Sequence, residues 1–84
     1  MKVKDHIAIF IKYHWNNNIA TFKTRQIQEL SYRGEDKYGY RLGSPDTYTR
    51  EFRSMKENGL ISVRPVRNTT TKDNTWYLEG HSLW

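Results

Sequence analysis

The chain has no cysteine, only two prolines and no long run of apolar residues. Without cysteine there is neither a disulfide framework nor a thiolate metal site, so packing alone must hold the fold. No segment approaches the roughly 20 apolar residues that a membrane-spanning helix requires. The N-terminal stretch MKVKDHIAIF carries Asp5 and lacks a small-residue cleavage site, unlike a secretory signal. We therefore expect a cytoplasmic protein that makes no membrane contact.

Catalytic motifs are also missing. The histidines, His6, His14 and His81, are scattered, and the first two are too far apart for an i, i+4 metal pair. Glu35 and Asp36 are adjacent but belong to no acid–base or metal motif. There is no glycine-rich phosphate loop and no serine elbow. We expect a protein that is not an enzyme and has no metal or cofactor, with its histidines at the surface or at a helix edge.

What the chain does contain fits one basic domain. Its 84 residues, 1–84, form a single unit, and three Trp, six Tyr and three Phe give a small core large side chains to bury. Fourteen Lys and Arg against nine Asp and Glu give a net charge of +5. This balance favours a polyanionic partner and makes nucleic acid plausible.

The hydrophobic pattern predicts an α+β fold. Apolar residues at helical spacing predict a first helix over 3–15, which the asparagines at 16–18 end. A short strand over 19–22 follows, and then a short second helix that Thr24 can cap. The segment 31–43, SYRGEDKYGYRLG, has three glycines and three tyrosines without a clean period, so we expect a loop.

The clearest element is a third helix over 45–58. Ser44 is a good N-cap, Pro45 suits the first helical position, and Gly59 suits the C′ position that ends a helix. Its apolar residues lie four and three apart and should face the core: Tyr48, Phe52 and Met55.

Two alternating segments follow this helix. ISVRPVR places Ile61 and Val63 on one face, and TWYLE places Trp76 and Leu78 on one face, so the two segments should pair as a hairpin. Pro65 cannot donate a ladder hydrogen bond, which suits an edge strand. The polar stretch NTTTKDN forms the tip, and 80–84 is a C-terminal tail.

This order of elements, together with the text TYTREFRSMKENGLISV, resembles the winged helix-turn-helix family from about Ile7 to Glu79. The chain is also similar to small single-domain helix-turn-helix proteins of phages and other mobile elements. The resemblance implies three helices, a short strand and a C-terminal β-hairpin wing. It implies a transcriptional regulator or replication accessory protein with helix 45–58 in the major groove of duplex DNA and wing 64–74 on the backbone. One departure is the loop 31–43, inserted where the family has a short turn of about 3–4 residues.

The outward face of the third helix supplies the first candidate DNA contacts, because arginine can hold guanine or phosphate and hydroxyls suit phosphate. They are Thr47, Thr49, Arg50, Arg53 and Ser54. A different interpretation stays open: Asp46 with Arg50, and Arg53 with Glu57, are four apart and would pair along an exposed helix.

Further candidates flank this helix. In the wing, Arg64, Arg67, Asn68 and Lys72 are opposed only by Asp73, a composition that fits a phosphate backbone or an ordinary polar loop. Beside the N-terminus of the second helix, Lys23 and Arg25 can clamp a phosphate.

Two other functions remain open. The first is a protein-binding winged helix, an inhibitor or assembly factor, with the tyrosine-rich loop or the apolar Leu83 and Trp84 as its contact surface. The second is single-strand binding, because the loop interleaves tyrosines with cations and such rings stack on unpaired bases. One monomer offers a small DNA site, so a homodimer or a larger complex would raise its affinity.

Overall fold

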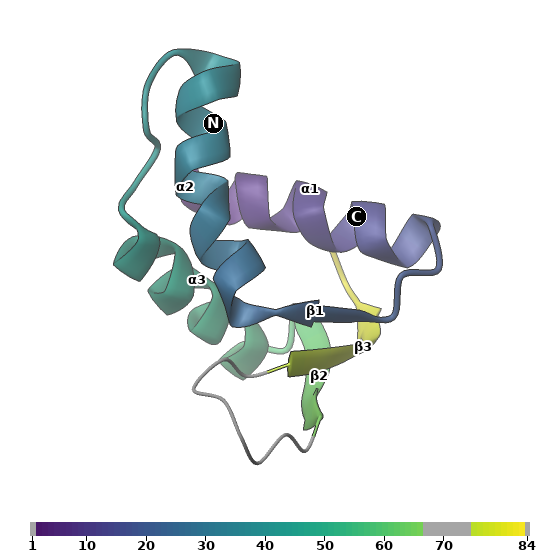
Figure 1. Cartoon of the computed structure of the whole chain (residues 1–84). Coiled ribbons are helices and arrows are strands. Elements are labelled where there is room, and N and C mark those ends of the chain that lie inside the picture. The colour runs from purple at the N-terminus through teal and green to yellow at the C-terminus, as the bar shows by residue number, and fades with distance from the viewer. Residues whose placement is uncertain (1, 67–74, 84) are drawn as a thin grey trace.

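The computed structural model describes residues 2–66 and 75–83, without the side chains of residues 35, 36 and 38. It contains three helices and one antiparallel sheet of three strands, which confirms the α+β prediction (Figure 1). None of the described helices is long and apolar enough to cross a membrane. The elements in chain order are α1 (Val3–Asn16), β1 (Thr21–Lys23), α2 (Thr24–Tyr38), α3 (Pro45–Glu57), β2 (Ile61–Val66) and β3 (Thr75–His81).

The last strand in the sequence, β3, lies in the middle of the sheet, with β1 on one side and β2 on the other. The hairpin of β2 and β3 is confirmed, and a bulge interrupts their register between Ser62 and Val63. Pro65 stands on the edge strand β2, as its missing N–H requires. The first strand starts at Thr21, two residues later than predicted. The predicted tip of the hairpin, 67–74, lies outside the described residues.

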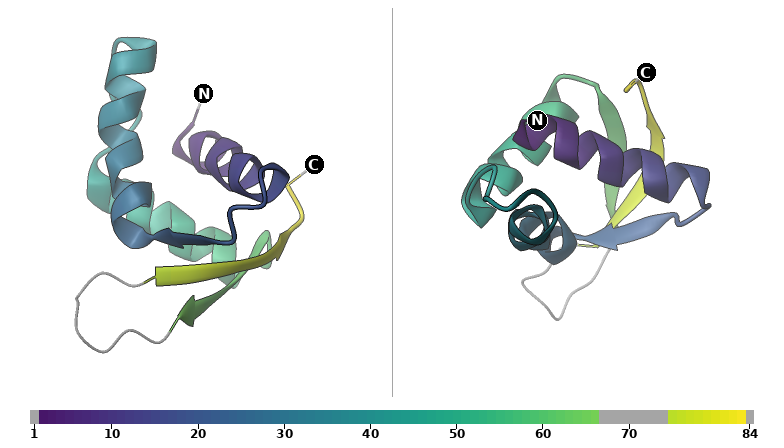
Figure 2. Two further views of the ribbon diagram at one scale, coloured as in Figure 1. Left: turned by 45° about the vertical axis from the view of Figure 1, so that its right-hand side comes forward. Right: turned by 90° about the horizontal axis from the view of Figure 1, so that it is seen from above.

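The core lies between the helices and one face of this sheet. Figure 2 shows α1 crossing over the sheet and α2 standing at one end of it. On β1, Phe22 is buried and both of its neighbours are exposed, so the strand buries one face only. The rings of Phe22 and Phe52 meet edge to face with centroids 5.8 Å apart. The buried hydrophobic residues are Val3, Ile7, Ile11, Phe22, Ile27, Leu30, Tyr48, Phe52, Met55, Ile61 and Leu78.

The second helix is not short, and the prediction of a loop over 31–43 is wrong for residues 31–38. Gly34 lies inside α2 and is buried, and a Cβ added there would be 3.5 Å from His6 Cε1 and 3.6 Å from the Tyr48 hydroxyl. These are ordinary van der Waals distances, so the glycine is packed inside the helix and does not break it. The α2 helix ends before Gly39, whose φ of 79° is in the left-handed region that favours glycine. Only residues 39–44 connect α2 to α3.

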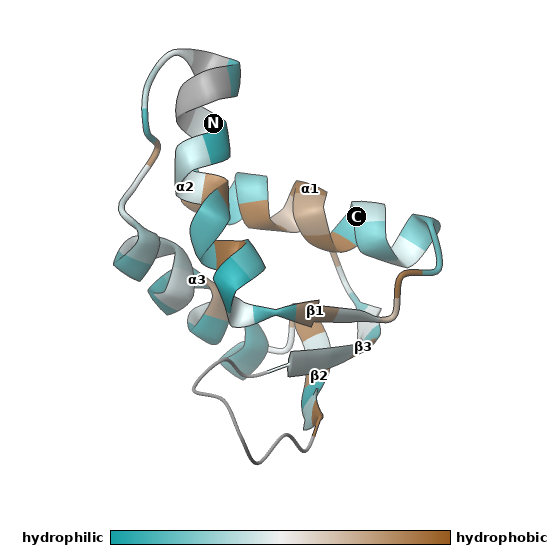
Figure 3. Ribbon diagram, viewed as in Figure 1, coloured by the Kyte–Doolittle hydropathy of each residue, from teal (hydrophilic) through white to brown (hydrophobic). Residues whose placement is uncertain are grey.

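The third helix agrees with its prediction to within one residue. Ser44 Oγ accepts a hydrogen bond from the Thr47 N–H at 3.2 Å, and Pro45 is the first helical residue. The helix ends at Glu57, and Gly59 follows with a φ of 75°. The three residues predicted to face inward are buried, and Figure 3 shows the rest of α3 mostly in hydrophilic or neutral colours.

The histidines of α1 are not at the surface, which makes that prediction wrong. His6 and His14 are both buried. His6 Nδ1 and the Tyr48 hydroxyl share a hydrogen bond of 2.7 Å that joins α1 to α3. Burial, together with the positive charge of Lys37, lowers the pKa of His6 below its ordinary value. His14 Nδ1 lies 3.0 Å from the carbonyl oxygen of Phe10, so this imidazole is satisfied within its own helix.

Candidate nucleic-acid interface

The outward face of α3 exposes two cations. Arg50 and Arg53 are exposed, and neither is joined by an ion pair to the acidic residue four positions away, Asp46 or Glu57, all four being described residues. The structure thus does not contain the ion pairs along this helix face that the spacing allows. Both guanidinium groups present their donors to solvent, where a phosphate or a base edge can accept them.

The three hydroxyl residues predicted on this face are engaged within the protein. The hydroxyls of Thr47 and Ser44 lie 3.0 Å apart in the N-cap of α3. Thr49 Oγ1 accepts from Gln28 Nε2 of α2 at 3.2 Å, so this side chain points toward α2. Ser54 Oγ accepts from Asn58 Nδ2 at 3.2 Å at the end of the helix. Their observed role is to cap α3 and position it against α2.

A cavity of about 70 Å³ lies where α3 meets β3 and the start of α2. Lys56 Nζ lies 4.7 Å from the centroid of the Trp76 ring, and Trp76 Nε1 donates a hydrogen bond of 2.9 Å to Thr24 Oγ1. Arg53 lines the same cavity. Two cations beside the first residue of α2 make a suitable environment for an anion, because the early N–H groups of a helix add partial positive charge.

Lys56 is the functional candidate that the sequence prediction missed. On α3 alone it lies at the flank of the exposed face, and only the packing of Trp76 from β3 beneath its ammonium group brings it to the cavity. The predicted pair Lys23 and Arg25 is exposed at the start of α2, where the Lys23 N–H already donates to Gln26 Oε1 at 2.8 Å.

Arg64, the one predicted wing cation among the described residues, has partners. Its Nε lies 3.3 Å from Glu79 Oε1, and its guanidinium carbon lies 4.7 Å from the centroid of the Tyr77 ring. This pair fixes Arg64 on the outer face of the sheet and neutralises its charge. The other predicted wing residues, Arg67, Asn68 and Lys72, lie outside the described part of the chain.

The tyrosines predicted for single-strand stacking belong to the end of α2 and the connection after it. Tyr32 is half-exposed, and Arg41 lies over its ring with the guanidinium carbon 4.7 Å from the centroid. This cation occupies one face of the ring that a base would use. Tyr40 is exposed beyond the end of the helix. At the C-terminus, Leu83 is half-buried against the core, and Trp84 lies outside the described residues.

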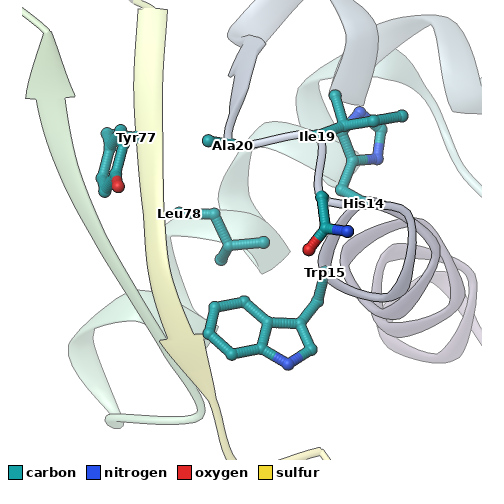
Figure 4. Close-up of a pocket in the computed structure, with 7 residues that line it drawn as sticks. His14, Trp15, Ile19, Ala20, Tyr77 and Leu78 are labelled. Carbon is teal, nitrogen blue, oxygen red and sulfur yellow. The ribbon is translucent and has the colours of Figure 1, made fainter.

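A second hollow, of about 310 Å³, opens where α1 ends beside β3 (Figure 4). Trp15, Ile19 and Leu78 line it, and the Leu78 N–H closes one wall by donating to the Ala20 carbonyl at 2.7 Å. No Lys, Arg, Asp or Glu is among the described residues that line this hollow. It offers a phosphate no charged partner and is separate from the cations of α3.

Comparisons with protein-family models, with curated proteins and with solved structures find no match to this chain. Among residues 2–66 and 75–83, no group of three His, Asp or Glu side chains is arranged to hold a metal ion. The features of the described residues that bear on function are the exposed cations of α3 and the cavity beside them.

Proposed function

We propose that this chain is a winged helix-turn-helix protein that binds duplex DNA without acting as an enzyme. The element order supports this fold: β1 lies between α1 and α2, and the hairpin of β2 and β3 follows α3 directly. The hairpin starts beside the end of α3, because β2 begins at Ile61, four residues after Glu57, and packs against that helix. In this proposal α3 enters the major groove, which is about 12 Å wide and admits one helix.

The observation that carries the proposal is a row of cations along α3. Arg50, Arg53 and Lys56 are spaced three residues apart, so they follow one oblique ridge over about 9 Å of the helix. At its C-terminal end, at Lys56, the row reaches the cavity beside Trp76 and Thr24. Arg50 is then placed for a base edge, and Arg53 and Lys56 for a phosphate of the flanking backbone.

Such a module would serve a small transcriptional regulator or a replication accessory protein. Phosphate contacts give general affinity and set the register of the helix, and the arginine nearest the bases supplies discrimination. Thr47, Thr49 and Ser54 contribute indirectly in this proposal, because they hold α3 in place rather than face the groove.

The test is fluorescence anisotropy of labelled random duplex and of each single strand, titrated with protein at several salt concentrations. Binding to duplex should weaken steeply with salt, because displaced counterions make the log–log slope about −0.9 per neutralised phosphate. The double variant Arg50→Ala/Arg53→Ala should make this slope less steep by about 1.8 if both residues contact phosphate, and by about 0.9 if only one does.

The matched control is Lys4→Ala/Arg33→Ala, which removes the same charge from exposed residues of α1 and α2. It should leave the salt slope unchanged. Equal effects of the two double variants would show a non-specific response to net charge and would contradict the assignment to α3. Single strands that bind as tightly as duplex would instead favour the tyrosines at the end of α2.

A further inference from the structure

A groove of about 300 Å³ runs between α1 and α2 and has no role in the proposed DNA interface. Two large apolar side chains of α1 stand exposed beside it: Ile9 is 45% exposed and Tyr13 is 58% exposed. Phe10 and Leu30 complete the apolar lining, and Arg33 and Lys37 of α2 line the same groove. An apolar surface of this kind, bordered by charge, marks a protein contact more often than an isolated exposed side chain does.

The spacing of these residues fits a helical ligand. Ile9 and Tyr13 are four apart on α1, and Leu30, Arg33 and Lys37 are three and four apart on α2. Each set therefore forms a stripe along its own helix, and because α1 and α2 cross at a steep angle (Figure 2), the two stripes meet at the groove. The longer stripe, on α2, spans about two turns, or 11 Å. An amphipathic helix laid along the α2 stripe would place residues at i, i+3, i+4 and i+7 against the apolar lining.

Charge decides which helix the groove accepts. Arg33 is exposed and makes no ion pair with Glu29, the carboxylate four positions before it on α2. Lys37 is exposed one turn further on. A ligand helix with acidic residues on its flank would meet two cations, whereas a second copy of this chain would bring two such cationic rims together at a net charge of +5 per chain.

We propose that the groove between α1 and α2 binds an acidic amphipathic helix of a partner protein. The contact is separate from the α3 face, because His6, which also lines the groove, bonds to Tyr48 on the buried side of α3, whereas Arg50 and Arg53 lie on its exposed side. A bound partner and a bound duplex therefore occupy different sides of the domain, and neither proposal depends on the other.

The probe is a labelled synthetic peptide of about 16 residues with capped termini, long enough to form a helix on binding. It carries leucine at i, i+3, i+4 and i+7 and glutamate at most other positions, and a matched peptide carries lysine in place of glutamate. Fluorescence anisotropy at moderate salt should show the glutamate peptide binding and the lysine peptide binding at least about tenfold more weakly.

The most discriminating variant reverses the charge of the two cations that line the groove. Arg33→Glu/Lys37→Glu should weaken the glutamate peptide about tenfold and strengthen the lysine peptide, an inversion that unfolding cannot produce. Arg50→Glu/Arg53→Glu makes the same change in net charge on α3 and should alter neither preference. Tyr13→Ser should weaken both peptides, and far-ultraviolet circular dichroism checks that each variant is folded.

Three results would overturn the proposal: no saturable binding of the glutamate peptide, equal binding of both peptides, or unchanged affinities in the Arg33→Glu/Lys37→Glu variant. Sedimentation velocity could give a fourth result that would overturn the proposal. A dimer that Tyr13→Ser dissociates would show that the groove is occupied by a second copy of this chain. None of these readouts uses DNA, so failure here is distinct from failure of duplex binding.

Discussion

Replacing Gly34 by alanine is expected to stabilise the fold by about 1 kcal/mol, because glycine inside a helix costs about that much relative to alanine. Gly34 lies inside α2, four residues before its last residue, Tyr38. The added Cβ would lie 3.5 Å from His6 Cε1 and 3.6 Å from the Tyr48 hydroxyl, which are ordinary van der Waals distances. No neighbour has to move, so no packing cost offsets the gain. In a domain of this size the melting temperature should rise by about 4–8 °C.

The assay is thermal and urea unfolding followed by circular dichroism, with Gly39→Ala as the matched control. A Cβ on Gly39 would meet nothing within 4 Å, but the φ of 79° is left-handed. This substitution should therefore destabilise the fold by about 1–2 kcal/mol. Opposite signs at the two glycines are the expected result. A lower melting temperature for Gly34→Ala would refute the reasoning and would favour a loop in place of the second half of α2.

Three further predictions concern the core, the α2–β3 contact and the α3 cations. Since the pKa of His6 is lowered from 6.5, the unfolded chain binds more protons in the window below 6.5, so stability should fall as pH falls through it. Urea unfolding at several pH values should show this slope, and His6→Gln should flatten it. Thr24→Val leaves Trp76 Nε1 without its acceptor and should cost about 1 kcal/mol of unfolding free energy; no change would show that water replaces the hydroxyl. Lys56→Ala should make the salt slope of duplex binding less steep by about 0.9, and an unchanged slope would remove Lys56 from the interface.

The parts of the fold that could be predicted from sequence depend on local chemistry. The third helix is an example, because Ser44, Pro45 and Gly59 each act within a turn of their own position. The hairpin is another, since alternation along β2 and β3 reports which face is buried. The bounds of the third helix were correct to within one residue, and the pairing of the two strands was confirmed.

The length of α2 could not be predicted in this way. Gly34 has the local character of a helix breaker, and what keeps the helix intact is its packing against His6 and Tyr48, which are distant in the sequence. The burial of His6 has the same origin, because its hydrogen-bond partner comes from α3. Tertiary contacts outweighed local propensity at both positions.

Only part of the candidate site could be predicted, because the rest of it also depends on contacts between elements that are distant in the sequence. Periodicity identified Arg50 and Arg53 as outward, since direction on a helix follows from spacing alone. It could not show that Thr49 bonds to Gln28 of α2, or that Trp76 of β3 lies beneath Lys56. Both facts depend on which elements become neighbours, and no residue within α3 carries that information.

The two proposed surfaces can be tested apart from stability because their charged residues lie outside the core. Arg33, Arg50 and Arg53 are exposed and form no ion pair with a described residue, so replacing them removes no observed contact of this kind. Surface substitutions of this type usually change the free energy of unfolding by no more than about 0.5 kcal/mol. If such a variant has the melting temperature of the parent chain but no longer binds, the substitution has removed a contact with the ligand. The core residues beneath, such as Tyr48, do not allow this distinction, because their removal would disturb both surfaces together.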